Sequence, residues 1–93
     1  MTDSAKSVAV TMYTSSGCGY CTMAERLLHA RGVEVIDKIR VDLDPAQRRQ
    51  MMARTGRRTV PQIYIGNKHI GGYTELSELD RAGKLSPLLQ IAE

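Results

Sequence analysis

The chain has 93 residues, enough for one hydrophobic core and too few for two domains. Its net charge of +3 is modest, and no aromatic residues interleave with its arginines, so nucleic-acid binding is not expected. No apolar run approaches the ~20 residues of a membrane helix, and residues 1–7 lack the apolar segment of a signal peptide. We therefore expect a cytoplasmic protein, not a membrane protein, with a flexible N-terminal tail over residues 1–7.

The N-terminal half of the chain predicts a strand, a helix, a second strand and a second helix. In residues 8–13 the larger apolar side chains recur at every second position, and β-branched residues are enriched. This pattern indicates a buried strand. A helix is expected from about residue 18 to 31, ended by Gly32, and residues 33–41 predict the next strand. Asp44 and Pro45 are typical of a helix start, here for a helix over residues 45–54. The side chains expected to face the core from the two helices are Cys21, Ala24, Leu27, Leu28, Met51 and Met52.

The C-terminal half predicts a β-hairpin followed by two helices. Residues 59–65 alternate like a strand, and Pro61 must lie at an end or an edge because proline cannot donate to the ladder. A turn at Gly66-Asn67 leads into a short strand over residues 68–70. Thr74 is expected to cap a helix that runs to about residue 81, and Ser86-Pro87 to open the last helix. The expected core side chains are Leu76, Leu79, Leu88, Leu89 and Ile91.

The predicted order is therefore β-α-β-α-β-β-α-α. A helix between the first two strands implies a right-handed parallel crossover, and the last two strands form an antiparallel hairpin. The fold class is α/β, with a four-stranded mixed sheet flanked by helices. Residues 1–93 are expected to form a single domain.

Both cysteines of the chain, Cys18 and Cys21, lie at the junction of the first strand and the first helix. A C-x-x-C at such a junction is typical of a redox motif, and its loop is too short to add much stability as a disulfide. The N–H groups at a helix N-terminus favour a thiolate, the nucleophilic form. We therefore expect Cys18 to be the attacking sulfur and Cys21, one turn further, to be the buried resolving partner.

Three motifs in register give this chain a family resemblance. They are Cys18-Gly19-Tyr20-Cys21, Thr59-Val60-Pro61 and Gly71-Gly72-Tyr73-Thr74-Glu75. The sequence resembles the glutaredoxins, most of all the short bacterial dithiol type, here with Gly19 where that type usually has proline. The resemblance implies the thioredoxin fold and a glutathione-dependent oxidoreductase that reduces protein–glutathione mixed disulfides and protein disulfides. It also implies a monomer with glutathione as co-substrate.

The resemblance also implies a glutathione groove around Cys18. The backbone of Val60, before a cis Pro61, would bind the cysteinyl part of glutathione as an added strand does. Arg57 would bind the glycine carboxylate, and the start of the helix after Gly72 would receive the γ-glutamyl end. The full set of expected binding residues is Tyr20, Arg57, Thr59, Val60, Pro61, Gly72, Tyr73 and Thr74.

Three departures from the family pattern leave alternatives open. Ser15 and Thr74 stand where many members have lysine and an acidic residue, so Arg57 or Arg58 would have to replace part of the missing positive charge. Gly19 favours a second function, because members that share a [2Fe–2S] cluster between two protomers and two glutathiones often lack that proline. A thioredoxin served by a flavoprotein reductase is a third reading, although the chain has no tryptophan.

The remaining polar residues carry less specific signals. His29 and His69 are expected to be solvated surface residues. The cluster of Arg54, Arg57 and Arg58 suits a small anionic ligand, or is only a solvated face. No metal site is predicted within one chain, because one C-x-x-C supplies only two of the four ligands of a zinc site.

Overall fold

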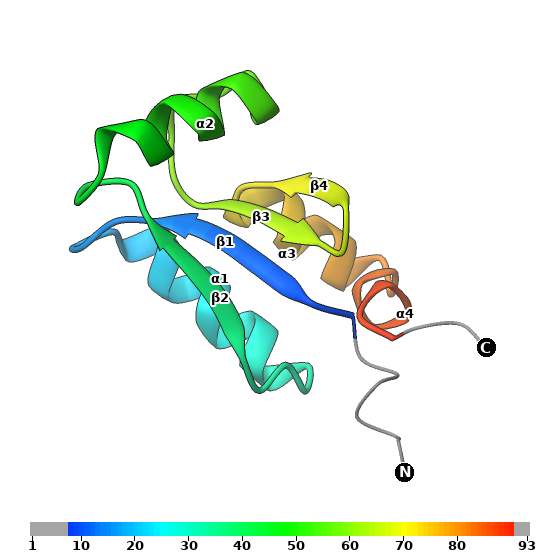
Figure 1. The fold of residues 1–93 in the computed structure, drawn as a ribbon. Coiled ribbons are helices and arrows are strands. Elements are labelled where there is room, and N and C mark those ends of the chain that lie inside the picture. Colours follow the sequence, from blue (N-terminus) through cyan, green and yellow to red (C-terminus); the bar gives the residue numbers. More distant parts are fainter. Residues whose placement is uncertain (1–7, 91–93) are drawn as a thin grey trace, which may run out of the picture.

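The computed structural model describes residues 8–90 (Figure 1). The expected N-terminal tail and Ile91 of the last helix lie outside these residues. Eight elements follow one another in the predicted order: β1 (Val10–Thr14), α1 (Gly19–Ala30), β2 (Ile36–Arg40), α2 (Pro45–Thr55), β3 (Gln62–Ile65), β4 (Lys68–Gly71), α3 (Tyr73–Arg81) and α4 (Leu85–Leu88). No helix within residues 8–90 has the length and apolar character needed to cross a membrane.

The four strands form one mixed sheet in the order β2-β1-β3-β4. β1 and β2 are parallel, with Val10 opposite Ile36, and α1 makes the crossover between them. β3 runs antiparallel to β1, and β4 is its hairpin partner at the edge. The predicted crossover and hairpin are both confirmed.

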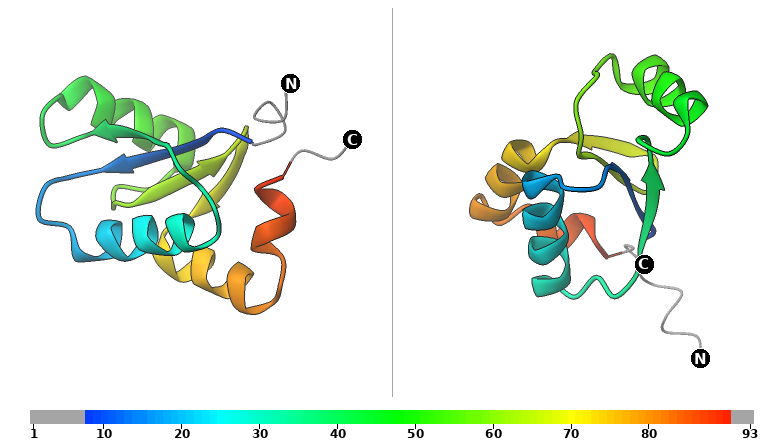
Figure 2. Two further views of the ribbon diagram at one scale, coloured as in Figure 1. Left: turned by 90° about the horizontal axis from the view of Figure 1, so that it is seen from below. Right: turned by 90° about the vertical axis from the view of Figure 1, so that its left-hand side faces the viewer.

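Helices cover both faces of this sheet (Figure 2). α1 and α3 lie together on one face, where Leu28 and Leu76 are fully buried against the sheet and α4. α2 lies on the other face, where Met51 is fully buried against Tyr13 and Tyr64. Because side chains alternate along a strand, Met12 and Ile63 face α1 while Tyr13 and Tyr64 face α2.

Three strands, β1, β2 and β3, begin later than the sequence pattern predicted. Residues 8–9, 33–35 and 59–61 lie outside the ladders, although all were included in predicted strands. Val35 is 79% exposed, so its apolar side chain does not belong to the core. Pro61 precedes β3, as its missing N–H requires.

The start of α3 also differs from the prediction. Gly72, not Thr74, is the N-cap residue, and Thr74 is exposed in the first turn. The Gly72 N–H donates to Glu75 Oε1 at 2.7 Å, so the helix is capped by the acidic side chain three residues later. Gly71 has a φ of +115°, and a Cβ there would lie 2.9 Å from that same oxygen, so glycine is required before the cap.

Candidate functional site

Cys18 is the N-cap residue of α1, at the end of the loop that follows β1. Its half-buried Sγ accepts a hydrogen bond from the Cys21 backbone N–H at 3.1 Å. The sulfur therefore occupies the place of the side-chain oxygen in an ordinary N-cap, where unpaired N–H groups and the helix dipole favour negative charge. The position predicted for Cys18 at the helix start is confirmed.

Cys21 lies one turn further along α1 and is only 4% exposed. Burial raises the pKa of the Cys21 thiol, and the neighbouring Cys18 sulfur raises it further. Both cysteines are free thiols in this structure. A half-buried sulfur at the helix end and a buried thiol of raised pKa behind it suit different steps of thiol–disulfide exchange.

The loop before β3 lies beside the nucleophile. Val60 O is 3.8 Å from Cys18 Sγ, and the Val60–Pro61 peptide bond is cis, as the family resemblance implied. The Val60 side chain packs against the Tyr13–Met51 cluster under α2. The first and second sequence motifs therefore meet in space.

The third motif reaches the same place through Gly72. A Cβ on Gly72 would lie 3.4 Å from Pro61 O, so the two segments are in close approach. Arg57 Nη1 lies 3.5 Å from Glu75 Oε1, the oxygen that also caps α3. Arg57 is thus attached to the motif whose backbone was predicted to bind the γ-glutamyl end.

Two predicted groove residues form an aromatic pair. Tyr20, 62% exposed in the first turn of α1, stacks on Tyr73 in the first turn of α3. Their ring centroids are 6.1 Å apart, with an angle of 27° between the planes. The pair therefore joins the helix turn of the nucleophile to the turn that follows Gly72.

Two basic residues of β2 lie near the cysteines, each paired with an acidic residue, which the sequence analysis did not predict. Lys38 and Arg40 line a hollow of about 200 Å³ together with Ser15 and both cysteines. Lys38 pairs with Glu25 at 2.6 Å, and Arg40 pairs with Asp42 at 2.7 Å. The signal was the alternation of two basic residues along one strand, which places both on one side of the sheet.

The three clustered arginines do not act as one patch. Arg57 contacts Glu75, whereas Arg54 donates to Tyr13 Oη at 2.8 Å and lies 4.1 Å from the centroid of the Tyr64 ring. Arg58 is exposed, and its carbonyl accepts from Arg48 Nη1. A single anion site built from all three guanidinium groups is therefore not what the fold forms.

The two histidines have different surroundings. His29 is exposed, as expected. The prediction for His69 was wrong: this side chain is half-buried, and its ring lies 5.1 Å from the Tyr64 ring. Its Nε2 is 2.8 Å from Oε1 of Gln62, a fully buried polar side chain that the sequence analysis passed over. A polar residue in a strand of otherwise buried apolar side chains was the available signal.

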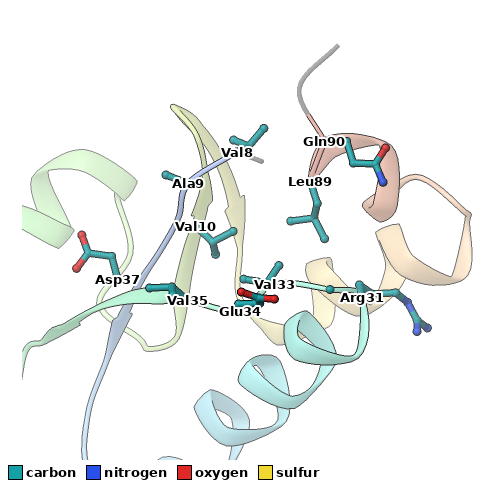
Figure 3. Close-up of a pocket in the computed structure, with 11 residues that line it drawn as sticks. Val8, Ala9, Val10, Arg31, Val33, Glu34, Val35, Asp37, Leu89 and Gln90 are labelled. Atoms are coloured by element: carbon teal, nitrogen blue, oxygen red, sulfur yellow. The ribbon is translucent and has the colours of Figure 1, made fainter. Parts of the chain in front are cut away.

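A larger hollow of about 620 Å³ lies at the opposite end of α1 (Figure 3). It is lined by Arg31, Val33 and Val35 from the segment after α1, by Val10 of β1 and by Leu89 after α4. Since α1 has 12 residues, its C-terminal end is roughly 18 Å from Cys18. Val8 and Gln90, at the two ends of residues 8–90, also line this hollow, and we assign no function to it.

Comparisons with known proteins agree with this geometry. The family model described as "Glutaredoxin" matches residues 10–70. The glutaredoxin of Neisseria meningitidis serogroup A is 55% identical over 80 residues, which cover 86% of this chain and 94% of that protein. Glutaredoxin 3 of Escherichia coli K12 is 44% identical over 81 residues, which cover 87% of this chain and 96% of that protein.

A solved structure shows the same fold. The crystal structure of a buckwheat glutaredoxin–glutathione complex superposes with a TM-score of 0.81 at 34% identity and covers 91% of this chain and 83% of that chain. The predicted thioredoxin fold is thereby confirmed, and the reading as a thioredoxin is not supported. The chain belongs to the glutaredoxin family: it is a glutathione-dependent thiol–disulfide oxidoreductase of the bacterial type, with Cys18 and Cys21 as its dithiol pair.

Proposed function

We propose that Cys18 is the attacking thiolate of this oxidoreductase and that Cys21 is the resolving thiol. The observation that carries the proposal is the hydrogen bond from the Cys21 N–H to Cys18 Sγ at the first turn of α1. Cys18 is half-buried while Cys21 is 4% exposed, so only Cys18 can meet the disulfide of a large substrate. The Cys-Gly-Tyr-Cys sequence is the active-site variant used here.

The reaction follows from this arrangement. The Cys18 thiolate attacks the glutathionyl sulfur of a protein–glutathione disulfide, the old S–S bond breaks, and the protein leaves as a thiolate. A second glutathione thiolate then attacks the glutathionyl sulfur on Cys18, releases the Cys18 thiolate and forms glutathione disulfide. Alternatively, Cys21 loses its proton and attacks Cys18, which forms the Cys18–Cys21 disulfide and releases glutathione.

We place glutathione in the groove between the cis-proline loop and the start of α3. The Val60 backbone pairs with the cysteinyl part, with Thr59 and Pro61 shaping the loop. Gly72, Tyr73 and Thr74 receive the γ-glutamyl end at the N-terminus of α3. Arg57 binds the glycine carboxylate, and Tyr20 covers the groove from the α1 side. Glutathione bound to the buckwheat relative, together with the approach of these motifs to one another, supports this placement.

The substrates are then glutathionylated or disulfide-bonded proteins. The protein acts as a monomer, because one chain supplies both thiols. Its thiols must be returned to the reduced state by glutathione, so the cytoplasm remains the expected compartment.

The test is the reduction of a small glutathione mixed disulfide, coupled to NADPH through glutathione reductase. Cys18→Ser should abolish turnover, whereas Cys21→Ser should keep it, since glutathione itself can resolve the intermediate. Matched folding of the two variants is checked by circular dichroism. Substantial turnover by Cys18→Ser would refute the assignment of the nucleophile.

A [2Fe–2S] cluster held by two protomers and two glutathiones is the second candidate. The observation that favours it is open space at the motif: no atom lies within 4 Å of a Cβ placed on Gly19. Such a cluster needs four thiolates, which in this arrangement would come from Cys18 of each protomer and from the two glutathiones. Visible absorbance and a dimer in anaerobically purified protein, together with near-zero turnover, would put this function first.

A further inference from the structure

A hydrogen-bonded chain of three residues links the outer strand of the sheet to the loop beside Cys18. His69 on β4 lies 2.8 Å from Gln62 Oε1 on β3. Gln62 Nε2 donates to the Thr59 carbonyl at 2.9 Å and approaches the Thr59 hydroxyl at 3.4 Å. Gln62 is fully buried, so these partners satisfy an amide that has no access to water.

The chemistry of these three residues allows only one arrangement of hydrogen-bond donors and acceptors. The Thr59 carbonyl can only accept, so the Gln62 amide nitrogen must face it and the amide oxygen must face His69. His69 Nε2 must then carry a proton and donate. Burial and the charges of Arg57 and Arg54 lower the pKa of His69 against the opposing charge of Glu75, which favours the neutral ring. The contact with Gln62 Oε1 requires the ring proton to be on Nε2.

The planarity of the peptide group carries this restraint to the ligand side. Thr59 O and the Val60 N–H belong to one planar unit and point in opposite directions. A hydrogen bond that fixes Thr59 O therefore also fixes the direction of the Val60 N–H. That N–H has no hydrogen-bond partner among residues 8–90, and the Val60 carbonyl is 3.8 Å from Cys18 Sγ.

We propose that Gln62 and His69 are positioning residues: through Thr59 they hold the Val60 backbone at the angle at which it binds the cysteinyl part of glutathione. Neither side chain touches the ligand or the sulfurs. The inference rests on the proposed role of the Val60 backbone. It attributes the orientation of that backbone to two side chains, one on β3 and one on β4. When the hydrogen bonds that link His69, Gln62 and Thr59 are removed, the binding of glutathione should weaken, while thiol–disulfide exchange at Cys18 continues.

The first test replaces Gln62 by methionine, which has nearly the same length but no amide. In the coupled assay, Gln62→Met should raise KM for the glutathione mixed disulfide about fivefold, as expected for the loss of roughly one hydrogen bond. Its kcat should stay within about twofold, because bound substrate still meets Cys18. The control is Ile65→Ala, a buried position on the same strand whose side chain faces α1. It should lower the unfolding midpoint and leave KM unchanged.

The second test keeps the proposal falsifiable if Gln62→Met does not fold. His69→Leu removes the donor and should raise KM for the glutathione mixed disulfide. His69→Gln places an amide N–H where Nε2 was and should keep KM near the wild-type value. Wild-type KM in both Gln62→Met and His69→Leu would overturn the inference. Failure of the proposed function would give a different result. The Cys18→Ser variant, with Gln62 and His69 unchanged, would then retain turnover.

Discussion

The carboxylate of Glu75 contacts both Gly72 and Arg57, two residues of the proposed glutathione groove, so its removal is a sharp test of that site. Its Oε1 accepts the Gly72 N–H at 2.7 Å and lies 3.5 Å from Arg57 Nη1. The hydrogen bond from Gly72 is the largest cause that lowers the pKa of Glu75, and the charge of Arg57 adds to it. Replacing Glu75 by alanine removes both contacts and leaves the N–H of the N-cap residue Gly72 without this acceptor.

The two contacts are not of equal weight. A hydrogen bond to a charged group contributes about 1.5–3 kcal/mol, and a carboxylate side chain that is 41% exposed belongs at the lower end. The ion pair with Arg57 is long and solvated, so it contributes ~0–1 kcal/mol. We expect Glu75→Ala to lower the free energy of unfolding by about 1.5 kcal/mol, which for a domain of this size lowers Tm by roughly 6–12 °C.

The assay is urea unfolding followed by circular dichroism over a series of pH values. Because the folded-state pKa of Glu75 is lowered, its contribution is fully present above the ordinary value of 4.5 and is lost as pH falls through the folded-state pKa. The difference between wild type and Glu75→Ala should therefore be largest near neutral pH and shrink in acid. Glu75→Gln keeps an acceptor and should lose only about 0.5 kcal/mol.

The matched control is Glu78→Ala on the same helix. Glu78 is exposed and forms no ion pair within residues 8–90, so its removal changes the net charge equally without touching the cap. Equal stability losses for the two alanine variants would refute the reasoning, because the effect would then be one of helix charge. A loss for Glu75→Ala that does not depend on pH would contradict the role of the carboxylate charge.

Two further predictions concern the cysteines and the face under α2. Brief alkylation with iodoacetamide near neutral pH should give a single adduct on Cys18 by mass spectrometry, since Cys21 is buried and its thiol pKa is raised; an adduct on Cys21 first would be contrary to the assigned roles. Arg54→Leu should lower the free energy of unfolding by about 1–2 kcal/mol, because it removes the contact with the Tyr64 ring and the hydrogen bond to Tyr13. Arg54→Lys should recover less than half of that loss in the same denaturation assay, since an ammonium lacks the planar donor fork.

The sequence predicted most of the local structure because it depends on neighbouring residues. Asp44 caps α2 and its side chain accepts from the Ala46 N–H, as the Asp-Pro pair indicated. Gly56, at a φ of +72°, ends that helix one residue beyond the predicted end at residue 54. The error at α3 arose from a competition between two caps. Thr74 has the preferred residue type, but the reach of Glu75 back to Gly72 starts the helix earlier.

The candidate site was predicted in its parts but not in its connections. The placement of Cys18 beside the Val60 carbonyl agrees with the motifs. Sequence spacing could not indicate that Arg57 contacts Glu75, or that Lys38 reaches the hollow beside the cysteines, because these pairs come from separate elements. His69 appeared solvated because a short edge strand alone does not show which of its side chains a partner strand will cover.

The sequence by itself determined the order of the elements, the dithiol at a helix start and the family, since turn residues, apolar periods and adjacent motifs are local properties of the chain. Only the tertiary structure decided how the motifs act together. The antiparallel pairing of β3 and β4 places His69 next to Gln62. Gln62 in turn bonds to Thr59, in the loop whose Val60 carbonyl lies beside Cys18. Such contacts depend on strand register and helix packing, which are set by the whole core, whereas a motif shows only its own few residues.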